Sequence, residues 1–245
     1  MRGAAVALAA AALVAGCGDE AAGGERLIVS AAASLTEPLT ECSRAFEGAQ
    51  VRLSFGGSDE LAAQIRQGVR PDVYAAANTT LPEQLAGEGL LAEPVEFATN
   101  ELVIAVPAGG VRVASLVDLA QPGVDLVLGA ESVPVGAYAH EVLSRLPAER
   151  ERAILANVRS EEPDVGGVVG KVAQGAADAG VVYRTDIVDG LEAVELPGAL
   201  RPAVAYGAGV VEEAPQPELA RRYLDGMTDG ACADALRAAG FGPAG

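Results

Sequence analysis

Two serines lie where apolar stretches give way to helix-like sequence, and their hydroxyls are the first groups in this chain that could do chemistry. Ser34 follows RLIVSAAA, and Ser58 follows VRLSFGG. Neither turn offers an acid, a base or a metal ligand at its tip. A hydroxyl beside the unpaired N–H groups of a helix start can instead donate hydrogen bonds to an anion.

Each serine also has a purely structural interpretation. Ser34 and Glu37 have the spacing of a capping box, and Ser58 is a candidate N-cap of the next helix. Taken alone, Ser34 is more simply explained as a cap. Gly56 and Gly57 leave the backbone before Ser58 free to turn and allow a ligand to come close.

Three more turns could supply donors. Val135 lies in SVPVGAYA at the start of a helix-like segment, and Val165 follows Asp164, a candidate helix cap. Tyr183 ends the strand-like run AGVVY. Alone, the valines are apolar loop residues and Tyr183 is a core aromatic. Together with the two serines, they predict an anion site built from helix N-termini and hydroxyls.

The elements that must position these residues alternate along the chain. Strand-like runs such as RLIVSAA, VRLSFG and ELVIAVP are followed by helix-like segments. This alternation predicts an α/β fold with mainly parallel strands. In such sheets ligands bind beyond the carboxyl ends of strands, and the candidate turns lie there.

The composition limits the partners. A net charge of −17 with a single lysine, Lys171, excludes a nucleic-acid-binding protein, which needs clustered basic residues. The same acidity does not exclude an anion site made of neutral dipoles. At physiological salt, charges further away than about 8 Å are largely screened.

The first residues predict export. Residues 1–16 have the basic start and apolar run of a signal peptide, and VAGC resembles the lipobox of bacterial lipoproteins. That resemblance implies lipidation of Cys17, a tether over 17–26 and an extracytoplasmic protein anchored to the cell membrane. The alternative is an ordinary signal peptide with an incidental cysteine.

Two cysteines remain, Cys42 and Cys232. Outside the cytoplasm an even pair suggests a disulfide, here between the first and the last helical regions. Two separate buried thiols are the other possibility, and the sequence leaves both open.

Seven motifs, in order, resemble the periplasmic molybdate-binding proteins of ABC transporters. The match runs in order from about Leu27 to Phe241, with these motifs: AAASLT, SFGGSDELAAQI, PDVYAAAN, ATNELVIAVP, SVPVGAYA, EEPDVGGVVGKVAQGAADAGVVYRTD and GFG. The resemblance implies a type II periplasmic-binding-protein fold. Two doubly wound α/β lobes, residues 27–100 with 208–245 and residues 101–207, would be joined by two hinge crossovers around a ligand cleft.

The resemblance also implies the ligand and its contacts. Molybdate or tungstate would be held by the hydroxyl and N–H groups of Ser34 and Ser58, the N–H groups of Val135 and Val165, and the Tyr183 hydroxyl. These residues would meet the metal only through the oxygens of the oxyanion, with no cofactor. The expected partner is an ABC permease, and the protein is expected to be a monomer.

Two departures from the family pattern affect the site. Val135 stands where the family often has a small residue, which could narrow the pocket. Asp59 and Glu60 follow Ser58 where many relatives have Ser or Thr. Carboxylates suit a helix's first turn but would repel an anion, so both are expected to face solvent.

Two rival functions remain. A hydrolase needs a nucleophile with a base, but the only histidine, His140, lies mid-helix, and no G-x-S-x-G motif occurs. GGVVGKV lacks the spacing of a phosphate loop. The prediction is therefore a binding protein and not an enzyme. The same fold binding another tetrahedral oxyanion, such as sulfate, stays open.

Overall fold

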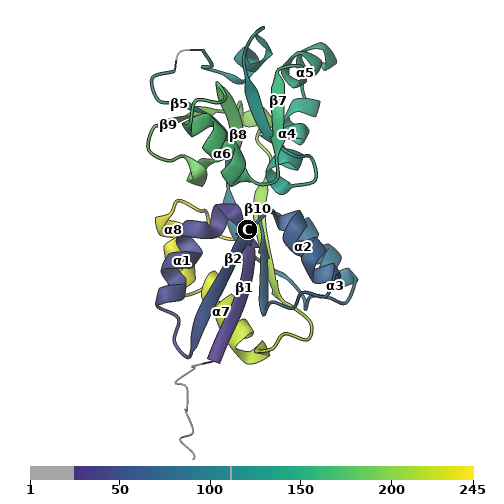
Figure 1. The fold of residues 1–245 in the computed structure, drawn as a ribbon, viewed down its shortest axis with the longest axis vertical. Coiled ribbons are helices and arrows are strands. Elements are labelled where there is room, and N and C mark those ends of the chain that lie inside the picture. The colour runs from purple at the N-terminus through teal and green to yellow at the C-terminus, as the bar shows by residue number, and fades with distance from the viewer. Residues whose placement is uncertain (1–24, 111) are drawn as a thin grey trace, which may run out of the picture.

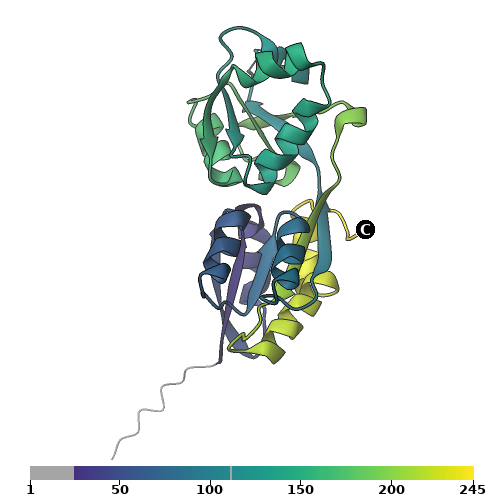
Figure 2. The ribbon, with the colours of Figure 1, turned by 90° about the vertical axis from the view of Figure 1, so that its right-hand side faces the viewer.

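Two α/β lobes make up the computed structural model, which describes residues 25–110 and 112–245. Figure 1 shows one lobe above the other, and Figure 2 shows that the connecting segments run along one side. The prediction of two α/β lobes is confirmed. The predicted signal peptide and Cys17 lie outside the described residues. The predicted tether over 17–26 is two residues too long, because the first strand already begins at Glu25. Within the described part of the chain, no helix combines the length and apolarity needed to span a bilayer.

The first lobe is built on a five-stranded sheet with strand order β2-β1-β3-β10-β4. Its strands are β1 (Glu25–Ala32), β2 (Ala49–Gly56), β3 (Val73–Ala76), β4 (Val95–Asn100) and β10 (Val204–Val210). β1 is parallel to β2 and β3, whereas β10 is antiparallel to β3 and β4. Leu27, Val29 and Ala31 share one face of β1 and are completely buried, whereas Ile28 on the opposite face is 37% exposed.

The second lobe has a similar five-stranded sheet with strand order β7-β6-β8-β5-β9. Its strands are β5 (Leu102–Pro107), β6 (Leu126–Gly129), β7 (Val158–Glu162), β8 (Ala179–Tyr183) and β9 (Leu191–Glu195). β6 is parallel to β7 and β8, and β5 is antiparallel to β8 and β9.

Both sheets are thus mixed, although the sequence predicted mainly parallel strands. The reason lies in the crossovers. β1, β2, β3, β6 and β7 end in turns that lie between the lobes. The chain enters β5 from the first lobe and β10 from the second lobe. Both strands therefore begin at the edge of their sheet that faces the other lobe, and they run antiparallel to β8 and β3, respectively.

Helices cover the sheets of both lobes (Figure 1). In the first lobe they are α1 (Thr36–Arg44), α2 (Ser58–Arg66), α3 (Thr80–Gly87), α7 (Pro217–Thr228) and α8 (Ala231–Ala238). In the second they are α4 (Pro134–Ser144), α5 (Ala148–Leu155) and α6 (Val165–Ala173). Four short 3-10 turns are η1 (Ala33–Leu35), η2 (Leu116–Ala120), η3 (Arg184–Asp186) and η4 (Gly198–Leu200).

The chain crosses between the lobes at two places. The first crossing is abrupt, since β4 ends at Asn100 and β5 begins at Leu102. The return runs from the end of β9 at Glu195 to Val204, which pairs with Asn100 in the sheet of the first lobe. The expected boundary at 207/208 therefore falls inside β10, and the structure places the return before Val204.

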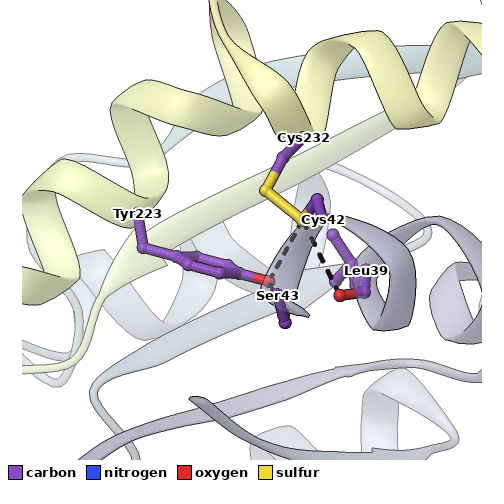
Figure 3. Close-up of a disulfide and its surroundings, with 5 residues drawn as sticks. All are labelled: Leu39, Cys42, Ser43, Tyr223 and Cys232. Atoms are coloured by element: carbon purple, nitrogen blue, oxygen red, sulfur yellow. Dashed lines mark hydrogen bonds between the residues drawn. A yellow bond between two sulfur atoms is a disulfide. The ribbon is translucent and has the colours of Figure 1, made fainter. Parts of the chain in front are cut away.

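A disulfide joins Cys42 of α1 to Cys232 of α8, with the two Cα atoms 4.8 Å apart (Figure 3). It connects the early and late parts of the chain within the first lobe, 190 residues apart in sequence. Beside it, the hydroxyl of Tyr223 lies 2.9 Å from that of Ser43. Closing so long a loop restricts the unfolded chain and typically stabilises a protein by about 2–4 kcal/mol.

Candidate functional site

One small cavity between the lobes brings together all five residues that the sequence predicted for the site. Its lining comes from both lobes: Ala32, Ala33, Ser34, Gly56, Gly57, Ser58, Ala77, Val133, Pro134, Val135, Asp164, Val165 and Tyr183. The centre of a water molecule can occupy about 20 Å³ of this cavity. That space suits one or two waters or a compact polyatomic ion, and an organic ligand typically needs far more.

Ser34 reaches the cavity from the turn after β1. The prediction that it caps α1 is wrong, because α1 begins at Thr36 and Leu35 is its N-cap residue. Ser34 belongs to the 3-10 turn η1 and lies one residue before the N-cap position of the α-helix. Its hydroxyl oxygen lies 3.1 Å from the hydroxyl of Tyr206 instead, and the residue is only 8% exposed.

Ser58 is the first residue of α2, and the prediction that it is the N-cap is also wrong. Gly57 is the N-cap residue, and Ser58 makes no capping bond. The Ser58 Oγ accepts a hydrogen bond of 3.1 Å from the N–H of Ala77, and its carbonyl accepts one from the Tyr74 hydroxyl. Since Oγ is used there as an acceptor, its proton remains available for the cavity.

The second lobe contributes two helix starts. Val135 lies in the first turn of α4, and Val165 is the first residue of α6. First-turn N–H groups have no partner within their own helix and carry the positive end of its dipole. Asp164 caps α6 as predicted, because its Oδ1 accepts from the N–H of Gly167 at 2.9 Å. The first N–H groups of both helices therefore remain for another acceptor.

Tyr183 ends β8 with its hydroxyl in the interior. The residue is 1% exposed, and its hydroxyl has no hydrogen-bond partner among the described residues. Burial raises the pKa of the Tyr183 hydroxyl well above its usual range, so it stays a neutral donor at physiological pH. A buried donor left unpaired costs about 1–3 kcal/mol, which favours an acceptor in the cavity.

Most polar groups in the described lining of the cavity are uncharged donors. Among the described residues, Asp164 is the only charged one in its lining, and no group of three or more His, Cys, Asp or Glu side chains could hold a metal ion. Hydroxyls and N–H groups that converge without a cation can hold an oxyanion whose oxygens accept in several directions.

Comparison with known proteins identifies the family. The model of the family described as "Bacterial extracellular solute-binding protein" matches residues 27–242. This chain belongs to that family. It is 36% identical over 228 residues to "Molybdate-binding protein ModA" of Mycobacterium tuberculosis, covering 89% of this chain and 85% of the relative. It is also 30% identical over 243 residues to "Putative ABC transporter substrate-binding lipoprotein YvgL" of Bacillus subtilis, covering 89% of each chain.

Solved structures agree with the fold. The "substrate binding domain of putative molybdenum ABC transporter from Clostridium difficile" superposes with a TM-score of 0.67 at 25% identity, over 90% of this chain and 99% of that one. The periplasmic molybdate-binding protein of Azotobacter vinelandii gives 0.77 at 22% identity, over 88% and 98%. The predicted family resemblance is confirmed.

The two carboxylates after Ser58 lie differently from each other. Glu60 is exposed, as predicted. The prediction that Asp59 faces solvent is wrong, because its Oδ2 accepts a 2.9 Å hydrogen bond from the Ser132 hydroxyl of the second lobe, and its Oδ1 is buried. Asp59 does not line the cavity. Asp59 contributes to the contact between the lobes. A prediction that treats each helix alone cannot identify such a contact.

Two contacts of this region were not predicted from the sequence. Gly57 lies against the second lobe, since a Cβ added there would be 2.5 Å from the carbonyl oxygen of Pro163. Tyr206 contacts Ser34 from β10, 172 residues away in sequence. The pair of glycines before Ser58 was a signal for close approach, whereas no local pattern marks Tyr206.

Asp186 supports a prediction about pH. Its Oδ2 is buried without a hydrogen-bond partner among the described residues, beside a hollow that Ser34 and Val165 also line. Burial raises the pKa of the Asp186 carboxyl from 3.8 to about 7. The folded state therefore binds a proton more tightly than the unfolded state, and stability falls as the pH rises from about 4 through 7.

Asp186→Asn should consequently raise the free energy of unfolding at pH 8 by about 1–3 kcal/mol and have little effect at pH 4. Urea unfolding of the variant and the parent protein between pH 4 and pH 8 measures this. Asp189→Asn, at an exposed neighbouring position, is the matched control. Parallel stability curves for Asp186→Asn and the parent would contradict the prediction.

Proposed function

We propose that this protein captures molybdate, and also tungstate, between its two lobes and delivers it to an ABC permease. The observation that carries the proposal is the convergence of uncharged donors from both lobes on one ion-sized cavity, where the buried Tyr183 hydroxyl has no hydrogen-bond partner among the described residues. The relatives named as molybdate-binding proteins support the same ligand.

In this proposal the contacts are divided between the lobes. The first lobe donates the hydroxyls and N–H groups of Ser34 and Ser58. The second donates the N–H groups of Val135 and Val165 and the Tyr183 hydroxyl. Neither lobe alone completes the set, so the ligand binds the closed arrangement better than an open one and shifts the population toward it.

Selectivity would follow from the size of this donor cage. Sulfate is smaller than molybdate and could not reach every donor at once, and each donor left unpaired costs about 1–3 kcal/mol. Sulfate remains the second candidate ligand, because the sulfate-binding protein SubI of Mycobacterium tuberculosis shares the fold with a TM-score of 0.79. At 15% identity that similarity concerns the fold alone.

The remaining predictions concern the setting of the protein. Its family is extracellular and binds solutes, which supports an extracytoplasmic location and a role in transport. We further propose a monomer, anchored through a lipid on Cys17, with no catalytic activity. His140 is not among the residues that line the cavity.

Titration calorimetry of the mature, unlipidated protein tests the ligand. Molybdate and tungstate should bind with similar affinity, and sulfate and phosphate should bind at least about 100-fold more weakly, which corresponds to one or two unpaired donors. Binding of sulfate in preference to molybdate would overturn the assignment and favour the second candidate.

A further inference from the structure

A tyrosine that does not line the cavity stands directly behind one of the proposed donors. Tyr206 is completely buried on β10, and its hydroxyl oxygen is 3.1 Å from the Oγ of Ser34. The distance alone does not say which hydroxyl donates to the other. The direction matters, because a Ser34 hydroxyl that donates its proton to Tyr206 cannot donate it to a ligand.

The neighbouring Asn100 settles the direction. The Oδ1 of Asn100 accepts from the backbone N–H of Glu101 at 2.8 Å. A backbone N–H only donates, so the oxygen of the amide must face it and the Nδ2 must face the other way. Nδ2 lies 3.4 Å from the Tyr206 hydroxyl oxygen and 2.8 Å from the Oγ1 of Thr185.

An amide nitrogen also only donates, so the Tyr206 oxygen receives a hydrogen bond from Asn100. The other described contact of the Tyr206 hydroxyl is with Ser34. The Tyr206 proton therefore forms a hydrogen bond if it points toward the Ser34 Oγ. The Ser34 oxygen then accepts, and the Ser34 proton is released toward the cavity. The reverse direction would leave the Tyr206 proton buried with no acceptor in its described contacts.

Two further features keep this arrangement fixed. Aromatic rings surround the Tyr206 ring edge to face, with centroids at 6.0 Å for Phe97, 5.7 Å for Tyr183 and 5.4 Å for Phe241. Burial also raises the pKa of the Tyr206 hydroxyl well above its usual range, so its proton stays in place. The packed ring therefore holds the Tyr206 hydroxyl in place, and the hydroxyl stays protonated at physiological pH.

We propose that Tyr206 and Asn100 are positioning residues that orient the Ser34 hydroxyl as a donor to the bound oxyanion. This inference rests on the proposed function. Neither residue touches the ligand in the proposal, and both act through Ser34. The chain of hydrogen bonds runs from Asn100 to Tyr206, from Tyr206 to Ser34, and from Ser34 to the ligand. Asn100 lies at the first crossover and also contacts Thr185, so the chain begins at the hinge.

Tyr206→Phe tests the inference because it removes the hydroxyl and keeps the ring. Its dissociation constant for molybdate should rise roughly 5- to 50-fold, as expected when a donor to a charged group loses its orientation. Tyr223→Phe is the matched control, since that buried tyrosine bonds Ser43 near the disulfide, away from the cavity. Its affinity should equal that of the parent protein.

A double-mutant cycle separates orientation from packing. In a Ser34→Ala background, Tyr206→Phe should change the affinity by less than about twofold, because no hydroxyl is left to orient. Asn100→Ala should weaken binding in the parent background and not in Ser34→Ala. An undiminished effect of Tyr206→Phe in Ser34→Ala, or parent-like affinity of Tyr206→Phe alone, would overturn the inference. Failure of the parent protein itself to bind molybdate would instead overturn the proposed function.

Discussion

Replacing Ser34 and Ser58 together by alanine is expected to weaken molybdate binding roughly 10²- to 10⁴-fold. In the proposed site these are the side-chain donors of the first lobe, and a hydrogen bond to a charged acceptor is worth about 1.5–3 kcal/mol. The double variant leaves that lobe with backbone N–H groups alone. Titration calorimetry with molybdate measures the loss.

The fold should survive this change. Neither serine caps a helix, and the double variant loses only the contact of Ser34 with the Tyr206 hydroxyl and the acceptor of the Ala77 N–H. Ser54→Ala, on an exposed position of β2, is a control in which affinity should not change. If the double variant bound molybdate as tightly as Ser54→Ala does, the two serines would not belong to the site.

The second large effect is expected from Gly57→Ala. The added methyl group would lie 2.5 Å from the Pro163 carbonyl oxygen, a separation that real Cβ atoms essentially never show. Pro163 belongs to the second lobe, so the methyl group would hold the lobes apart. Gly57 itself has φ −60° and ψ 132°, which alanine adopts readily. We therefore expect a folded protein that cannot close and binds molybdate at least about 100-fold more weakly, as when two donors are lost.

Small-angle X-ray scattering gives a readout of closure that does not depend on affinity. Molybdate should reduce the radius of gyration of the parent protein but not of Gly57→Ala. Gly87→Ala, on α3 and outside the cavity lining, is the control, since a Cβ there would meet nothing within 4 Å. Equal compaction of Gly57→Ala and Gly87→Ala by molybdate would show that the contact with Pro163 does not limit closure.

The sequence predicted the parts of the fold that depend on local pattern. Alternating strand-like and helix-like segments led to two α/β lobes, and the turns after β1, β2, β6 and β7 were recognised because small or capping residues mark them. The five predicted site residues come together because these turns, and the end of β8, all face the region between the lobes. They are Ser34, Ser58, Val135, Val165 and Tyr183.

What the sequence did not predict depends on contacts between distant segments. Ser34 fits a capping box locally, but the chain inserts a 3-10 turn before α1. Asp59 was expected in solvent because its contact, Ser132, belongs to the other lobe. Tyr206 meets Ser34 only because β10 returns into the first sheet antiparallel to β3. Helix propensity, capping rules and periodicity describe single elements, so they contain no information about these pairings.

The position of β1 has a mechanical consequence. β1 starts at Glu25 at the end of the first lobe that points away from the second (Figure 1). Any tether upstream of Glu25 would therefore be attached to the first lobe alone and would leave the second lobe free to move during closure. A lipid on Cys17 would in this way confine the protein near the membrane and raise its effective concentration at a permease without hindering closure.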